Sequence, residues 1–249
     1  MEIGAQLYTL REHCKTLPDF AATLEKVAEI GYKTVQVSGT CPWDAAWLRD
    51  ELRKNGLRCV LTHTPQARMR EDLDGVIRDH EVIGCDYIGL GFWAFDEERD
   101  MGYEKFMALW PAVARRIRQG GKYFMYHNHD REFIHLEGKP ILRHLMEKIP
   151  AEDMGVTVDT FWVQSGGGDP AAWIEELSGR VPCVHLKDYA YGHNMAVLGA
   201  GNLNFDRIFQ AAEKAGTKYL LVEQDDCHGE DPFDCLRRSY AYLKARGFE

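Results

Sequence analysis

Residues 20–37, FAATLEKVAEIGYKTVQV, contain the unit from which the fold is built. The first part has a stripe of apolar residues at helical spacing, formed by Phe20, Leu24, Val27 and Ile30. Asp19 stands before the stripe as a candidate N-cap. Gly31 follows it, and glycine just past a helix end commonly turns the chain back. The apolar run Thr34–Val37 then predicts a short buried strand.

This helix–glycine–strand order recurs along the whole chain. Similar joints are Lys54-Asn-Gly-Leu57, Val82-Ile-Gly-Cys85, Gln119-Gly-Gly-Lys122 and Lys214-Ala-Gly-Thr217. Eight strand-like runs alternate with helical stretches: Ile3–Tyr8, Thr34–Val37, Arg58–Thr62, Tyr87–Phe92, Tyr123–His127, Gly155–Asp159, Val181–Leu186 and Tyr219–Glu223. Eight β-α units in 249 residues predict an α/β protein with a (β/α)8 TIM barrel, in a single domain over residues 1–249. An open doubly wound sheet is disfavoured because the turn at residues 8–12 lacks a glycine-rich pattern.

Composition limits the partners and the compartment. The formal net charge is −9, which disfavours a surface that neutralises nucleic-acid phosphates or anionic lipid. The longest apolar runs are only four or five residues, as in Tyr219–Val222, far short of a membrane span. Seven cysteines without a CxxC pair favour a reducing compartment, and the N-terminus has no basic leader. We therefore expect a cytoplasmic protein that has no nucleic-acid or membrane partner. Assembly into homo-oligomers stays open.

In a (β/α)8 barrel, the active site lies at the carboxyl ends of the strands. The last four predicted strands end in imidazole, carboxylate and amine groups: His127 and His129, Asp159, His185 with Lys187 and Asp188, and Glu223. Strand alternation puts His127 and His129 on one side, and likewise His185 and Lys187. Nitrogen and oxygen donors from adjacent strands suit one divalent ion such as Mn²⁺, Fe²⁺, Co²⁺ or Zn²⁺, and no cysteine at these ends offers a thiolate.

Each of these residues also has a purely structural interpretation. Asp159 is placed to cap the turn that follows its strand, and a lone histidine such as His63 is often a packing residue. Asp188 is placed to pair with Lys187 or to cap a loop. Aromatic residues near the strand ends, Trp162 among them, fit either a barrel plug or the wall of a carbohydrate pocket. The metal hypothesis therefore depends on the whole group of residues.

The strand ends resemble those of the xylose-isomerase-like TIM barrels, the sugar phosphate isomerase/epimerase family. The motifs that carry the resemblance are Tyr126-His-Asn-His-Asp130, Val158-Asp-Thr-Phe-Trp162, His185-Leu-Lys-Asp188, Leu198-Gly-Ala-Gly-Asn-Leu203 and Val222-Glu-Gln-Asp225. The resemblance covers essentially the whole chain and implies one divalent metal, with Mn²⁺ as the first choice and Zn²⁺, Co²⁺, Fe²⁺ or Mg²⁺ as alternatives. By this resemblance, Asp159, His185 and Glu223 are ligands of that metal.

The chain departs from the family pattern on the fifth strand. Epimerases of the family present a glutamate there, where this chain has His127. His127 stays a suitable fourth ligand, but one of two proton-exchanging glutamates is missing. His129 is the natural substitute base. The His-Asn-His motif resembles members linked to inositol and keto-sugar metabolism, including dehydratases and lyases that act on 3-keto-glycosides.

The resemblance implies a metal-dependent isomerase or epimerase that acts on a sugar, keto-sugar or related polyol through an enediolate. A metal bound to the substrate carbonyl would stabilise the charge that forms when the α-proton leaves. His129 or Glu223 would take the proton, and Lys187 would stabilise the oxyanion. We expect five residues to contact the substrate, of which Asp188 could instead orient His185 or Lys187: Tyr8, Gln36, His63, Trp162 and Asp188.

Three alternatives stay open at this stage. The same enolate could lose a β-substituent, which would make the protein a lyase or dehydratase of keto-inositols or 3-keto-glycosides. An endonuclease IV-like hydrolase would need three zinc ions and more ligands than the first four strand ends offer. A sugar-binding barrel without catalysis would hold no metal. Gly199-Ala-Gly201 lies where barrels often hold phosphate, but no Lys or Arg adjoins it, which favours an unphosphorylated substrate.

Overall fold

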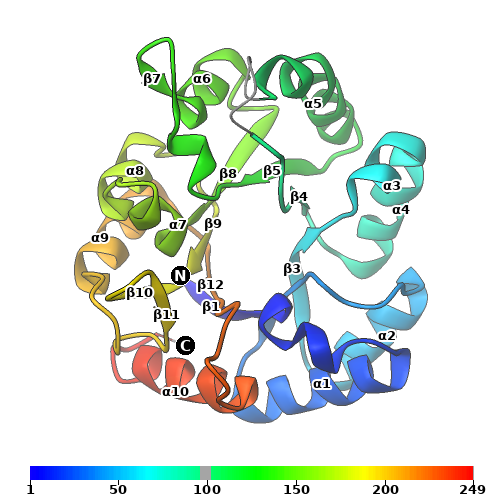
Figure 1. Ribbon diagram of the computed structural model, residues 1–249. Helices are drawn as coiled ribbons and strands as arrows, with labels where there is room; N and C mark the ends of the chain where they lie inside the picture. The colour runs from blue at the N-terminus through cyan, green and yellow to red at the C-terminus, as the bar shows by residue number, and fades with distance from the viewer. Residues whose placement is uncertain (96–101, 249) are drawn as a thin grey trace.

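In a computed structural model that describes residues 1–95 and 102–248, eight parallel strands close into a barrel with helices outside it (Figure 1). Around the barrel the strands follow the order β1-β12-β9-β8-β5-β4-β3-β2. Their bounds are β1 Glu2–Gln6, β2 Thr34–Val37, β3 Arg58–His63, β4 Tyr87–Leu90, β5 Tyr123–His127, β8 Met154–Asp159, β9 Cys183–Leu186 and β12 Tyr219–Val222. The predicted single-domain TIM barrel is confirmed.

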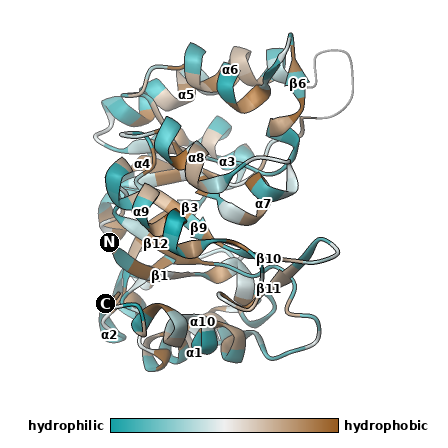
Figure 2. Ribbon diagram, turned by 90° about the vertical axis from the view of Figure 1, so that its left-hand side faces the viewer, coloured by the Kyte–Doolittle hydropathy of each residue, from teal (hydrophilic) through white to brown (hydrophobic). Residues whose placement is uncertain are grey.

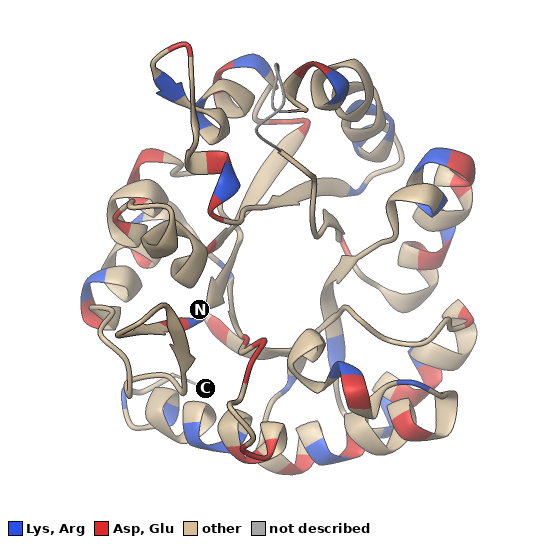
Figure 3. Cartoon of the chain, in the orientation of Figure 1, with Lys and Arg blue, Asp and Glu red and all other residues tan. Residues whose placement is uncertain are grey.

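The helices form the outer layer. Their bounds are α1 Leu17–Ile30, α2 Ala45–Lys54, α3 Gln66–Glu71, α4 Leu73–Ile83, α5 Tyr103–Gln119, α6 Ile141–Lys148, α7 Thr160–Ser165, α8 Pro170–Glu176, α9 Phe205–Ala215 and α10 Pro232–Lys244. Two 3-10 helices, η1 Leu7–His13 and η2 Arg131–Phe133, follow β1 and β5. Lys, Arg, Asp and Glu colour mainly the outer helices in Figure 3, whereas the barrel strands are mostly uncharged. None of the described helices is long and apolar enough to cross a membrane.

The helix ends follow the sequence signals with one correction. Gly31 and Gly84, just past α1 and α4, have φ angles of 121° and 71°, which an L side chain adopts only with strain. The N-cap of α1 is Thr16 and not Asp19 as predicted. Thr16 Oγ1 accepts the N–H of Asp19 at 3.3 Å, and its hydroxyl donates to the Asp19 carboxylate at 2.6 Å. Asp19 therefore supports the cap from three residues inside the helix.

The barrel interior is filled at its base. A separate cluster of buried side chains occupies the amino-terminal half of the barrel: Val60, Leu61, Tyr87, Met125, Cys183 and Leu221. A much larger apolar core lies between the strands and the surrounding helices, as the brown strand segments in Figure 2 indicate. Because this cluster fills the interior at the base, the cavity inside the barrel mouth lies around the carboxyl ends of the strands.

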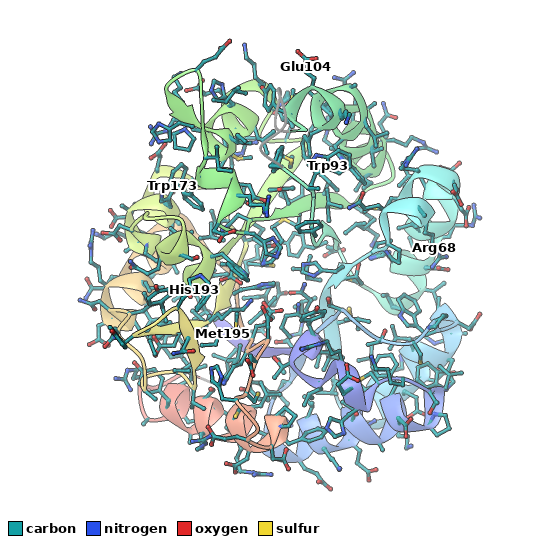
Figure 4. The ribbon with its side chains drawn as sticks, in the orientation of Figure 1. Arg68, Trp93, Glu104, Trp173, His193 and Met195 are labelled. Carbon is teal, nitrogen blue, oxygen red and sulfur yellow. The ribbon has the colours of Figure 1, made fainter. Side chains whose placement is uncertain are left out.

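Two small hairpins interrupt the β-α alternation, and we did not predict either. The pair β10 (Asp188–Ala190) and β11 (Asn194–Ala196) follows β9, and the pair β6 (His135–Leu136) and β7 (Lys139–Pro140) follows η2. His193 and Met195 lie beside the barrel mouth in Figure 4. Met195 Sδ accepts the N–H of Asp225 at 3.3 Å, so this hairpin helps to hold the segment that follows β12.

Candidate metal centre and active site

Four buried side chains converge at the carboxyl ends of neighbouring strands. His127 ends β5, Asp159 ends β8, His185 lies in β9 and Glu223 follows β12. One donor atom from each lies within 4.8 Å of the others. The strand register explains this convergence, because Asp159 is the direct partner of His185 in the parallel ladder. The N–H of Glu223 continues the next ladder by donating to Leu186 O at 3.1 Å.

Each histidine has one ring nitrogen engaged outside this centre. His127 Nδ1 lies 3.0 Å from Gly91 O, a carbonyl that can only accept, so this nitrogen carries the proton and Nε2 keeps a lone pair. His185 Nε2 lies 2.6 Å from Gln36 Oε1, which likewise assigns the free lone pair to Nδ1. A carbonyl partner that orients a histidine in this way is typical of metal sites.

In each of the two carboxylates, one oxygen likewise accepts a hydrogen bond from outside the centre, and the other oxygen faces the centre. Glu223 Oε1 accepts from Gln6 Nε2 at 3.0 Å, so Oε2 is left facing the centre. Asp159 Oδ1 accepts the N–H of Trp162 at 3.1 Å, and Oδ2 lies 3.3 Å from His127 Nε2. Asp159 therefore caps α7 through Oδ1, as the structural interpretation predicted, while its Oδ2 faces the cluster.

The four residues fit a divalent metal. His185 Nδ1 and Glu223 Oε2 lie 2.9 Å apart; Nδ1 is buried without a hydrogen bond, and Oε2 has an ion pair with Lys187 as its other contact. Buried polar atoms are rarely left in this state unless a ligand completes them. Two imidazole nitrogens and two carboxylate oxygens suit Mn²⁺, Fe²⁺, Co²⁺ or Zn²⁺. The cluster would hold one such ion, and its donor set does not choose among these metals.

Lys187 is an internal cation beside this cluster. Its ammonium is 1% exposed and lies 3.0 Å from one oxygen each of Asp159, Glu223 and Asp225. Burial alone would lower the pKa of Lys187, but the three carboxylates outweigh burial and raise it. These contacts favour the charged form of the lysine.

Asp225 is a member of the site that our sequence reasoning missed. Burial and the neighbouring Glu223 raise the pKa of Asp225 to about 6. One of its oxygens contacts Lys187, while Oδ1 is buried and has no hydrogen bond. In the sequence, Asp225 and Asp226 both follow the last strand, and nothing there tells which of the two faces the barrel axis.

A cavity of about 480 Å³ opens above the cluster. Of the residues predicted to contact the substrate, Tyr8, His63 and Trp162 line it. His63 Nδ1 lies 3.1 Å from Ser38 Oγ, whereas His63 Nε2 and Trp162 Nε1 are buried without a partner. Phe92 adds an apolar wall. An aromatic wall with isolated polar atoms is the usual form of a small-molecule site.

His129 also lines this cavity. Its ring is edge-to-face with those of His127 and Phe92, at centroid separations of 4.7 and 5.4 Å, and its Nδ1 has no partner. Burial, together with the nearby His127 and Lys187, lowers the pKa of His129 to about 3. The ring is therefore neutral at physiological pH and has a free lone pair.

Two residues predicted to contact the substrate lie elsewhere. Gln36 is fully buried beneath His185 and does not line the cavity, so we reassign it to the support of that histidine. Asp188 points away into the loop after β11, where its carboxylate accepts backbone N–H groups. Gln6 supports Glu223 as Gln36 supports His185, and Gln6 was not among our predicted site residues. A buried amide in a strand is the one sequence signal that could have indicated these roles.

Comparison with known proteins places the chain in a family. The family profile described as xylose isomerase-like TIM barrel matches residues 24–246. The chain therefore belongs to this family of barrels. It matches no curated protein sequence.

Solved structures share the fold at low sequence identity. A sugar phosphate isomerase/epimerase from Parabacteroides distasonis is 21% identical with a TM-score of 0.81, covering 98% of this chain and 93% of that one. An L-ribulose 3-epimerase is 18% identical with a TM-score of 0.77 and coverages of 98% and 94%. The probable 3-DHS dehydratase of Bacillus anthracis is 14% identical with a TM-score of 0.73 and coverages of 98% and 99%. These similarities establish the fold alone.

Proposed function

We propose that the protein is a metal-dependent isomerase or epimerase that removes an α-proton from a sugar, keto-sugar or related polyol. The observation that carries the proposal is that the two polar atoms of each residue in the four-residue cluster have different roles. His127, Asp159, His185 and Glu223 each use one polar atom for a structural hydrogen bond and aim the other at a common centre. The epimerases among the structures of the same fold support this reaction class.

The chemistry requires a Lewis acid and a base. A divalent metal held by the cluster would polarise a substrate carbonyl, which makes the neighbouring C–H acidic. We assign the α-proton transfer to His129, because its ring lines the cavity and its Nδ1 has no hydrogen-bond partner. Glu223 is less suited to this step, since Gln6 occupies one of its oxygens and the other faces the metal centre.

Two further residues complete the proposed mechanism. Lys187 lines the cavity beside the metal centre, and its positive charge favours the oxyanion that forms as the α-proton leaves, while its ammonium keeps its carboxylate partners. Trp162 packs against His129 at a centroid distance of 5.2 Å, which restricts the histidine ring and excludes water from it.

A lyase or dehydratase is the second candidate. The strand position that ends in His127 would need a carboxylate for two-sided proton exchange, and here it has an imidazole held by Gly91. A site with one free base suits elimination of a β-substituent after the same proton transfer. The dehydratase of similar fold supports this alternative.

Deuterium exchange tests the proposal. Mn²⁺-loaded protein in D₂O should introduce deuterium at the α-carbon of at least one member of a panel of ketoses, keto-inositols and 3-keto-glycosides. His129→Gln should slow this exchange by roughly 10²- to 10⁴-fold, because a positioned base contributes about that much. His193→Gln is the matched control on the rim. Product analysis distinguishes isomerisation, epimerisation and loss of a leaving group.

Metal analysis tests the remaining alternatives. We expect about one divalent ion per chain, because one cluster of the described residues has the required geometry. A stoichiometry near three zinc ions would instead favour the hydrolase, and a chain that holds none would favour a sugar-binding barrel. Absence of exchange with every panel member, despite bound metal, would contradict the proposed reaction.

A further inference from the structure

We infer that the substrate of this site is an uncharged carbohydrate, and that the protein discriminates against the phosphorylated form of the same sugar. This inference rests on the proposed function and narrows its substrate class. Two independent features support it: a backbone anion site that the chain fills with its own carboxylate, and a cavity whose charges are balanced without a phosphate.

The first feature lies in the loop that follows β11. Phosphate-binding barrels commonly hold the anion on backbone N–H groups of the loops after the seventh and eighth strands. Here the N–H groups of Gly199 and Gly201 both donate to Asp188 Oδ2 at 2.9 Å. Those of Leu203 and Tyr189 donate to Asp188 Oδ1 at 3.2 and 2.8 Å. The carboxylate of Asp188 thus occupies the position that an external anion would take.

The fit between this loop and Asp188 leaves no room for a second anion. A Cβ atom built on Gly201 would lie 2.4 Å from Asp188 Oδ1 and 2.7 Å from Tyr189 O. The glycine therefore allows the loop to close directly on the carboxylate. Asp188 is itself buried, with no exposed surface. The loop serves as an internal hydrogen-bonding site and does not present donors to the cavity.

The second feature is the charge balance beside the cavity. Asp159, Glu223 and Asp225 surround the single ammonium of Lys187. Three carboxylates and one ammonium leave two negative charges, which one divalent cation would neutralise. A phosphate group would add a further charge of nearly −2, and no lysine or arginine among the described residues that line the cavity is left to pair it. Burying an unpaired charge is strongly unfavourable.

The cations near the cavity that belong to the described part of the chain already have partners. Among the described residues that line it, Lys187 is the only lysine or arginine. Arg11 lies at the rim, where it donates to Tyr8 O at 3.0 Å and to Asp225 O at 2.9 Å. Its guanidinium also covers the Tyr8 ring at 4.5 Å. Neither side chain is free to form the bidentate contacts that favour phosphate binding.

The free polar atoms of the cavity suit hydroxyl groups instead. His63 Nε2, Trp162 Nε1 and Asp225 Oδ1 are buried without hydrogen-bond partners in residues that line the cavity. They offer both donor and acceptor positions. Sugar hydroxyls donate and accept in the same way, and the rings of Tyr8 and Phe92 can cover the C–H faces of a sugar.

Matched pairs of ligands test the inference on the Mn²⁺-loaded protein. The probes are D-fructose with D-fructose 6-phosphate, D-xylulose with D-xylulose 5-phosphate, and inorganic phosphate. Calorimetry measures binding, and D₂O exchange measures enolisation. We expect each phosphorylated member to bind roughly 100-fold more weakly than its free partner, because its phosphate would add negative charge beside a site that Lys187 and the metal already balance. Inorganic phosphate should not bind.

The outcomes distinguish a failure of this inference from a failure of the proposed function. If a phosphorylated sugar binds or exchanges better than its free partner, the inference is overturned while the proposed function stands. If no carbohydrate binds or exchanges, the proposed function and the substrate class both fall. Tight binding of inorganic phosphate by the wild-type protein would also overturn the inference.

A variant tests the filled anion site directly. Asp188→Ala removes the internal carboxylate, so phosphate should raise the melting temperature of this variant and not that of the wild type. Asp206→Ala, which removes an exposed carboxylate paired with Arg246, is the matched control. A folded Asp188→Ala protein without any phosphate response would overturn the assignment of this loop. If the variant does not fold, the ligand pairs on the wild-type protein still decide the inference.

Discussion

The two halves of the barrel make different contributions to one site. Strands β5, β8, β9 and β12, from the second half of the chain, bring the ionisable donors that face the centre. Strands β1 and β2 and the end of β4, from the first half, bring only neutral groups: the amides of Gln6 and Gln36 and the carbonyl of Gly91. Each neutral group contacts one ionisable donor: Gln6 and Gly91 do so from the neighbouring strand, and Gln36 from farther around the barrel.

The second half of the chain thus supplies the ionisable side chains, and the first half supplies the neutral groups that orient them. Had the first half supplied acids in place of these amides, additional charge would compete for the metal and for protons. An amide or carbonyl partner fixes the orientation of the donor and adds no net charge. The ionisable half is supported by further ionisable residues, including Glu132 and Asp188. We therefore expect variants of the two halves to differ both in magnitude and in pH dependence.

The largest effect should follow loss of a donor from the second half. His185→Ala removes one of the four proposed ligands, so bound metal should be lost and turnover should fall by at least about 10³-fold. Elemental analysis of purified protein measures the metal. His63→Ala is the matched control from the first half and should keep it. Equal metal content in His185→Ala and the wild type would refute the ligand assignment.

Glu132, in the second half of the chain, should make the stability of the folded protein depend on pH. Burial raises the pKa of Glu132 from 4.5 to about 7, despite the hydroxyl of Tyr126 and the N–H of His129 that its carboxyl accepts. The folded protein then binds this proton more tightly than the unfolded chain. The stability that Glu132 contributes is complete below pH 4.5 and is lost as the pH rises through 7.

Glu132→Gln should remove this dependence. The variant should gain about 3 kcal/mol relative to the wild type between pH 4.5 and pH 7.5. Urea unfolding at several pH values measures the difference. The exposed Glu147→Gln is the control, and its offset from the wild type should show no such rise. A constant difference between Glu132→Gln and the wild type across this range would contradict the prediction.

A smaller effect should follow loss of an aligning amide. Gln36→Leu leaves His185 Nε2 without its acceptor, so metal affinity should fall by roughly 10- to 100-fold while the protein stays folded. Metal titration by calorimetry measures the change. Gln66→Leu, on the cavity rim, should bind metal like the wild type. If Gln36→Leu and Gln66→Leu do not differ, alignment from the first half is dispensable.

The smallest effect should appear at Ser38. Its hydroxyl lies 3.1 Å from His63 Nδ1, and Ser38→Ala removes this contact without touching the metal cluster. Substrate affinity should fall by about 1 kcal/mol. Metal affinity should be unchanged, which a calorimetric titration of the variant checks. A loss of metal affinity as large as that of Gln36→Leu would place Ser38 among the metal-aligning groups.

Much of the fold was predictable because its signals are local. The bounds of β2 and β5 were predicted to the residue, since apolar β-branched and aromatic runs stand between polar and glycine breaks. The strand β9 begins at Cys183 and not at Val181 as predicted, because Pro182 has no N–H for the ladder. The hairpin β10–β11 was missed because three-residue strands carry almost no periodicity.

The site was predictable only in part, because its supports are not local. The four predicted ligands do lie together, since strand ends of a barrel meet at one face. The partner of His185 is Gln36, which lies 149 positions away in the sequence. Strand alternation shows that Gln36 faces inward, but not which side chain lies across from it. The same limit applies to Asp188, whose loop partners were unknown until the hairpin was seen.

The packed base of the barrel limits the routes by which substrate and product can enter and leave. Buried side chains such as Tyr87, Met125 and Leu221 close the end opposite the cavity. Substrate, product and water must therefore share one mouth. Product has to leave before the next molecule enters, so departure through that mouth sets an upper limit on turnover however fast the proton transfer is.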